Sequence, residues 1–189
     1  MEMFEYIAVL TSIIIGLGIT QLLQGFTRLV QHPEQGKVYW VHLSWVIYMF
    51  LTTVCWWWWE FRLGTVEEWT FALYMFVLLY AVIIYLLCAF LFPASFSDYD
   101  GSKGYFYSKC TWFFGLLVLV NLVDLCDTLL KGMEHFASLG SEYPIATILK
   151  IALAGVAMFS KNERYHAAIA VAFLLYQLSW AVRPFYTVG

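Results

Sequence analysis

Charged side chains are scarce in this sequence: they make up 12% of its 189 residues, well below the share that is usual in a soluble domain. Apolar residues make up 62%, and the mean hydropathy is +0.75. The net charge is only −3, which provides no basic surface for nucleic acid, so nucleic acid is not expected as a partner. This composition predicts a single integral membrane domain over residues 1–189, surrounded by the lipid bilayer.

Several familiar motifs are also missing. No basic segment precedes the first apolar stretch, so the N-terminal residues do not have the pattern of a secretory signal peptide. There is no Gly-x-Ser-x-Gly elbow and no His-Glu-x-x-His pair. The four cysteines lie in or beside apolar segments, without the spacing of a metal site or a disulfide framework. We therefore predict no catalytic residue, no cofactor and no metal site, and the sequence leans away from an enzyme.

What the sequence does contain is apolar stretches about as long as a bilayer is thick. Six of them approach the ~20 residues that a spanning helix requires. Pro, Gly and charged residues separate them and favour helix ends. Four consecutive tryptophans, Trp56–Trp59, predict an aromatic belt at a membrane interface. We expect an all-α bundle of six transmembrane helices, at about residues 6–30, 38–60, 69–92, 111–131, 144–160 and 165–185.

Basic residues near the ends of these stretches predict the orientation. The first side of the membrane has Arg28, Lys37, Lys103, Lys109, Lys161 and Arg164, and the second has Arg62, Lys131 and Arg183. The side with more basic residues is expected to face the cytoplasm. An even number of spans then places both termini outside the cell.

The most unusual segment is 121–131, which carries acids inside the fourth apolar stretch. Asp124 and Asp127 are three residues apart and share one helix face, with Asn121 nearby. A charge near the bilayer centre costs on the order of 3 kcal/mol, so each carboxylate needs compensation. Lys150 enters the membrane from the same side in the fifth stretch, at a similar depth. We expect the fourth and fifth helices to pack as a hairpin and Lys150 to pair with one of the two aspartates.

The second aspartate then has two alternatives. It keeps a proton, because burial and a neighbouring carboxylate disfavour its charge, or it pairs with Lys131 or Arg183. The candidate site therefore contains Asp124, Asp127 and Lys150, with Asn121 and Arg183 in support. One hypothesis is a small transporter or channel for an ion or a proton. The other is a non-transporting scaffold or subunit of a membrane complex, in which these charges only hold helices together. A homo-oligomer or a membrane partner protein fits either hypothesis.

A weak internal repeat is a further candidate feature. Residues 21–25 and 128–132 share the pattern Leu-Leu-x-Gly in helices that are expected to run in opposite directions. That is the arrangement of an inverted three-plus-three repeat, which many secondary transporters have.

Two segments carry a resemblance to known sequences. One begins Glu5-Tyr6-x-x-Val9-Leu10-x-Ser12 and continues to Gly16-Leu17-Gly18-Ile19-Thr20-Gln21, and the other comprises Trp112-Phe113-Phe114-Gly115-Leu116 with segment 121–132. They resemble a family of small, uncharacterised bacterial polytopic inner-membrane proteins, and the resemblance covers the first and fourth expected helices with their flanks, about a quarter of the chain. The resemblance implies a bacterial inner-membrane location, where termini outside the cell would be periplasmic, and it implies no function and no site residue.

Overall fold

The computed structural model describes residues 3–31, 38–66, 68–96 and 98–187. These residues form helices joined by short connections, with no strand among them. The helices are α1 (Met3–Gln31), α2 (Trp40–Glu60), α3 (Phe71–Phe90), α4 (Gly101–Leu130), α5 (Met133–Ser138), α6 (Glu142–Ala157) and α7 (Glu163–Thr187), with a 3₁₀ turn at Phe61–Thr65 after α2. The expected all-α fold is confirmed.

Among the residues that the structure describes, five helices are long and apolar enough to cross a membrane: α1, α2, α3, α4 and α7. Apolar side chains on one face of α1 are more than half exposed, among them Val9, Ile13 and Leu17. Surfaces of this kind are stable against lipid tails rather than water. The protein is therefore a multi-pass membrane protein whose helices contact lipid.

The sixth expected span is not confirmed. The segment forms helix α6, but α6 has 16 residues and ends at Ala157, three residues earlier than expected. At 1.5 Å per residue it is roughly 24 Å long, whereas the hydrocarbon core of a bilayer is about 30 Å thick. Residues 158–159 form a turn instead, and Phe159 is 81% exposed.

The predicted start of the fourth helix is wrong by ten residues. We expected α4 to begin near residue 111, because the preceding segment is polar and rich in Ser, Gly and Tyr. It begins at Gly101, and Ser102, Tyr105 and Phe106 are buried along one face of its first turns. Packing of that face outweighs the weak helix propensity of the glycines and serines.

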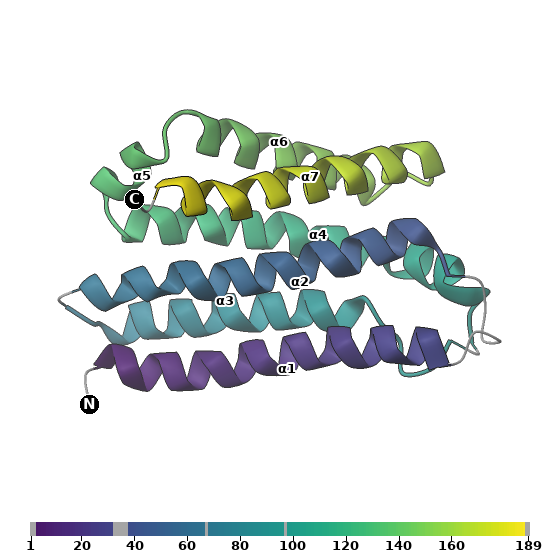
Figure 1. The fold of residues 1–189 in the computed structure, drawn as a ribbon, viewed down its shortest axis with the longest axis horizontal. Coiled ribbons are helices and arrows are strands. Elements are labelled where there is room, and N and C mark those ends of the chain that lie inside the picture. Colours follow the sequence, from purple (N-terminus) through teal and green to yellow (C-terminus); the bar gives the residue numbers. More distant parts are fainter. Residues whose placement is uncertain (1–2, 32–37, 67, 97, 188–189) are drawn as a thin grey trace.

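The long helices run along a common direction and alternate in sense (Figure 1). α1 packs on α3, α3 on α4, α4 on α6, and α2 on α7. α4 and α6 run antiparallel, as the expected hairpin requires (Figure 1). α1 begins and α7 ends at the same end of the bundle, where α5 also lies, and we refer to it as the α5 end (Figure 1). α1 and α4 run in opposite directions, which an inverted repeat needs, but no further feature supports the repeat.

The core is densely aromatic away from the α5 end. Trp45 of α2 is fully buried, and its ring contacts Phe113 and Phe114 of α4 and Phe173 of α7 at centroid distances of 5.2–5.4 Å. These four side chains are at most 3% exposed. We refer to them as the aromatic block, because they fill the space between α2, α4 and α7.

Candidate functional site

Lys131 joins two buried carboxylates at the α5 end. Its ammonium group lies 2.6 Å from Oδ2 of Asp127, one helical turn earlier on α4, and 2.9 Å from Oε1 of Glu60 at the end of α2. All three side chains are at most 7% exposed. Of the expected partners for a second aspartate, Lys131 is thus the one that the structure supports.

Asp124 has tyrosines as partners. Its Oδ1 accepts a hydrogen bond of 2.8 Å from Tyr80 of α3, and its Oδ2 accepts one of 2.8 Å from Tyr143 of α6. The hydroxyl of Tyr143 also lies 2.8 Å from that of Thr128. The carboxylate of Asp124 is therefore stabilised by two neutral donors from neighbouring helices.

The expected ion pair between Lys150 and an aspartate does not form. The Lys150 ammonium lies 5.8 Å from the centre of the Tyr176 ring, a distance typical of a cation–π contact. It is near enough to Asp124 for an electrostatic interaction, but the two make no ion pair within 4 Å. The sequence places Lys150 at the right depth, but Tyr80 and Tyr143 already occupy both oxygens of Asp124.

The two supporting residues differ in their positions. Asn121 is buried on α4 beside the site, and its amide donates to the carbonyl of Leu117 at 2.7 Å. Arg183 is exposed on α7 and pairs with Glu142 at 2.7 Å, because Glu142 lies in the first turn of α6 at the same end of the bundle. Arg183 is not among the residues that line the cavity described next, so its expected place at the site is not reproduced.

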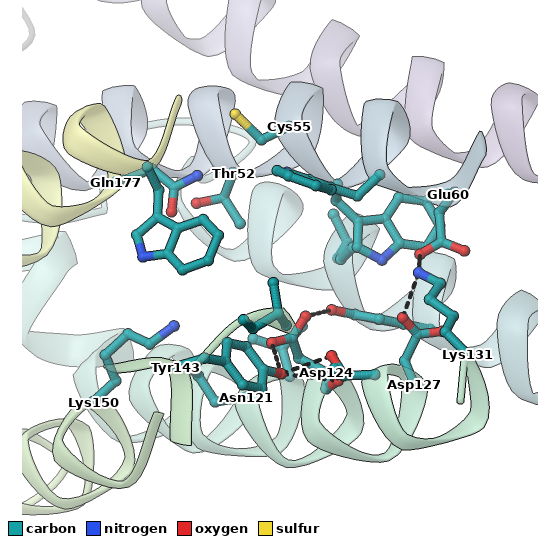
Figure 2. Close-up of a pocket in the computed structure, with 18 of the residues that line it drawn as sticks. Thr52, Cys55, Glu60, Asn121, Asp124, Asp127, Lys131, Tyr143, Lys150 and Gln177 are labelled. Atoms are coloured by element: carbon teal, nitrogen blue, oxygen red, sulfur yellow. Dashed lines mark hydrogen bonds and ion pairs between the residues drawn. The ribbon is translucent and has the colours of Figure 1, made fainter. Parts of the chain in front are cut away.

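A cavity of about 160 Å³ connects these groups. It extends from His135 of α5 to Tyr48, Lys150 and Gln177 in the interior of the bundle. Its charged walls are Glu60, Asp124, Asp127, Lys131 and Lys150, which are three carboxylates and two ammonium groups and sum to a formal charge of −1. Figure 2 shows Lys150 and the Glu60–Lys131 pair toward opposite ends of the cavity, with Asp124 between them.

One face of α2 presents unpartnered polar atoms to this cavity. Thr52 Oγ1, Trp56 Nε1 and Glu60 Oε2 are buried and have no hydrogen-bond partner, and their residues follow one another at intervals of four. Residues spaced by four lie on one face of a helix. Each buried polar atom without a partner costs about 1–3 kcal/mol, so polar molecules in the cavity would stabilise this face.

Glu60 was not predicted as a site residue, because it directly follows the four tryptophans that indicated a membrane interface. Trp57 and Trp58 are 38% and 75% exposed, as an interfacial belt requires, but Trp56 is only 6% exposed and lines the cavity. The belt is therefore only part of the role of this segment. The interval of four from Thr52 through Trp56 to Glu60 was the available signal.

His135 lies at the α5 end of the cavity, outside the candidate membrane spans. Its Nδ1 is 3.3 Å from a guanidinium nitrogen of Arg62. Burial and the nearby positive charges of Arg62 and Lys131 hold the pKa of His135 below its ordinary value of 6.5. His135 is therefore neutral at pH 7, and the cavity keeps its formal charge of −1.

Comparison with protein-family models, curated proteins and solved structures finds no match for this chain. Within the described residues, no three His, Cys, Asp or Glu side chains are grouped closely enough to hold a metal ion. The site must therefore be interpreted from its own geometry and charge.

Proposed function

We propose that this protein is a small membrane transporter that binds a proton or a monovalent cation in the cavity at the α5 end. The observation that carries the proposal is the excess of one carboxylate over the ammonium groups in the cavity wall. A net negative charge held inside a bundle is costly, and one bound positive charge would neutralise it.

The proposed site has two binding positions, in two parts of the cavity. Glu60 and Asp127 share Lys131, and the free oxygen of Glu60 makes this pair the first binding position. Asp124, held by Tyr80 and Tyr143, lies roughly 9 Å inside the end of α4 and is the second. Lys150 and Asn121 line the wall around it, and Arg183 supports the α6–α7 packing from outside.

The proposal includes a closed inner end. Tyr48 lines the cavity and contacts Trp45 of the aromatic block at 5.4 Å. A dense, dry aromatic layer is a barrier to ions. The described arrangement would then be one open state, and release on the other side would require these rings to move apart.

We infer that the protein resides in a bacterial inner membrane, with α6 as a sixth, short span and both termini in the periplasm. The resemblance of segments 5–21 and 112–132 and the excess of basic residues at the end opposite α5 support this location. The cavity would then open to the periplasm.

A scaffold is the second candidate function, and the same network supports it. Lys131 joins α4 to α2, and Asp124 joins α4 to α3 and α6. A network that connects four helices fixes their packing whether or not an ion ever enters.

Flux measurements in liposomes separate the two candidates. We expect the double variant Asp124→Asn/Glu60→Gln to have a proton or cation flux at least tenfold lower than that of the wild type. Glu142→Gln, which removes an exposed carboxylate outside the cavity, is the matched control and should retain flux. If the wild-type protein transports neither protons nor Na⁺ nor K⁺, and the double variant is less stable than the wild type, the scaffold is favoured.

A further inference from the structure

We propose that the cavity takes a small organic ammonium ion with an aromatic or similarly apolar body. This inference rests on the cation site of the proposed function and names the class of ligand that it would hold. Three properties of the wall carry it: its charge, its aromatic rings and its free acceptor.

The charge of the wall favours a cation over an anion. Lys131 lies between the carboxylates of Asp127 and Glu60, whose negative charges outweigh its own, so it offers little attraction to an anion. Lys150 lies near Asp124 and 5.8 Å from the centre of the Tyr176 ring. The carboxylate of Asp124 would repel an anion that approached Lys150. One carboxylate equivalent remains without a positive partner.

Aromatic rings form a large part of the wall and come from four helices. They are Tyr48, Trp56, Trp59, Tyr80, Tyr143, Tyr176 and Trp180. Trp56 meets Tyr80 edge to face at 5.0 Å, and Trp59 meets Trp180 at 6.3 Å. The faces of such rings attract organic cations, and ring edges and faces also pack against an apolar body. Lys150 over Tyr176 is an example of an alkylammonium group in this wall.

The free acceptor is Oε2 of Glu60. Glu60 is 5% exposed, and this oxygen is buried without a hydrogen-bond partner while Oε1 accepts from Lys131. An ammonium group of the ligand would donate to Oε2 and restore charge balance around Lys131. A metal cation is a weaker fit, because no group of three metal-ligating side chains occurs in the described residues.

The size of the cavity suits a ligand with one ring. At about 160 Å³ it resembles an engineered protein cavity of roughly 150 Å³ that binds benzene. It would otherwise hold about five waters at roughly 30 Å³ each. A benzyl group with one ammonium substituent matches both the volume and the charge.

Binding to the purified, detergent-solubilised chain tests this inference with three probes of nearly equal size. Benzylammonium is positive at pH 7, benzyl alcohol is neutral and benzoate is negative. By titration calorimetry we expect benzylammonium to bind at least tenfold more tightly than benzyl alcohol, and benzoate not to bind. Tighter binding of benzoate would make Lys150 the recognition group and overturn the inference. Equal binding of all three probes, or of none, would overturn it as well.

Two variants locate the probe. Glu60→Gln should weaken benzylammonium binding at least tenfold, whereas Glu142→Gln should leave it unchanged. Trp180→Leu removes one half-buried ring from the wall, and it should weaken binding severalfold without altering the ion pairs of Glu60. Retention of wild-type affinity in both Glu60→Gln and Trp180→Leu would place the probe elsewhere and contradict the assignment.

The binding result and the flux result are independent. Benzylammonium binding without transport of any cation would retain the ligand class and reject the transporter. Proton flux that depends on Asp124 and Glu60, without benzylammonium binding, would retain the proposed function and reject this ligand class.

Discussion

The ammonium group of Lys131 lies between the buried carboxylates of Glu60 and Asp127. Its removal would leave two negative charges close together and shielded from water. We expect Lys131→Met to lower the free energy of unfolding by about 3–5 kcal/mol, the usual cost of breaking a buried ion pair. Thermal unfolding in detergent measures this. Lys103→Met, which breaks the exposed pair with Glu163, is the control and should change stability far less.

Charge removal should rescue that variant. Glu60→Gln and Asp127→Asn, added to Lys131→Met, replace the buried charges by neutral groups and should recover most of the lost stability. If the triple variant is as unstable as Lys131→Met alone, then packing of the lysine stem, rather than charge balance, is what holds the α2–α4 contact.

His135 predicts a pH dependence with a definite sign. Its folded-state pKa lies below the ordinary 6.5, so the unfolded chain binds this proton first as the pH falls. The contribution of neutral His135 to the free energy of unfolding is therefore fully present above about pH 6.5 and decreases as the pH falls below that value. We expect the melting temperature to fall less in His135→Gln than in the wild type between about pH 7.5 and about pH 5.5.

The Glu142–Arg183 pair does not interfere with this measurement. Hydrogen bonding from Arg183 lowers the pKa of Glu142 below its ordinary 4.5, so Glu142 stays charged over the whole window. Equal slopes in the wild type and His135→Gln would show that His135 has an unshifted pKa and is not part of the cavity mouth.

The depth of the buried charges was predictable from the sequence, but their partners were not. Asp124, Asp127 and Lys150 could be placed at similar depths by counting along helices, and all three line the cavity. Counting could not show that Tyr80 and Tyr143 satisfy Asp124, because a tyrosine in an apolar helix is equally typical of packing or of an interface. Partner choice depends on how helices rotate about their axes, which hydrophobicity around a lipid-exposed bundle constrains only weakly.

Among the elements, α1 depends on close approach to the chain that follows α3. A Cβ added at Gly25 would clash with ring carbons of Phe92, a side chain that is 7% exposed. We expect Gly25→Ala to lower stability by about 1–3 kcal/mol, because the ring or the helix must shift. Thermal unfolding is again the measurement.

Gly16→Ala is the control for this element. A Cβ there meets nothing within 4 Å, so the substitution should be neutral or slightly stabilising through the better helix propensity of alanine. Equal losses at both glycines would mean that α1 does not pack on Phe92 as described.

The helices themselves were predictable to different degrees. α1, α2, α3 and α7 lie within a few residues of their expected bounds, since long apolar runs ended by Pro, Gly or charge determine them. The first ten residues of α4 could not be predicted, because buried Ser102, Tyr105 and Phe106 are what make a glycine-rich segment helical. The brief α5 was expected as a connection, and its short length gives no periodic pattern to detect.

For the whole molecule, orientation in the membrane is directly measurable. Ser138 ends α5 and Lys161 lies in the connection between α6 and α7, and both are exposed. These two segments lie at opposite ends of the bundle (Figure 1). In intact cells we expect Ser138→Cys to react with a membrane-impermeant maleimide and Lys161→Cys to react only after the membrane is opened. The reverse pattern would place the cavity on the cytoplasmic side, and labelling of both in intact cells would contradict a spanning bundle of fixed orientation.

The aromatic block has a consequence for how the protein would sense membrane voltage. A water-filled cavity would conduct, so the electrical potential would change little between the α5 end and Asp124. The remaining potential would then fall across the buried, poorly polarisable core that begins at the aromatic block. Moving one charge through the full potential is worth about 2.3 kcal/mol per 100 mV, and nearly all of it would act within this core rather than along the cavity.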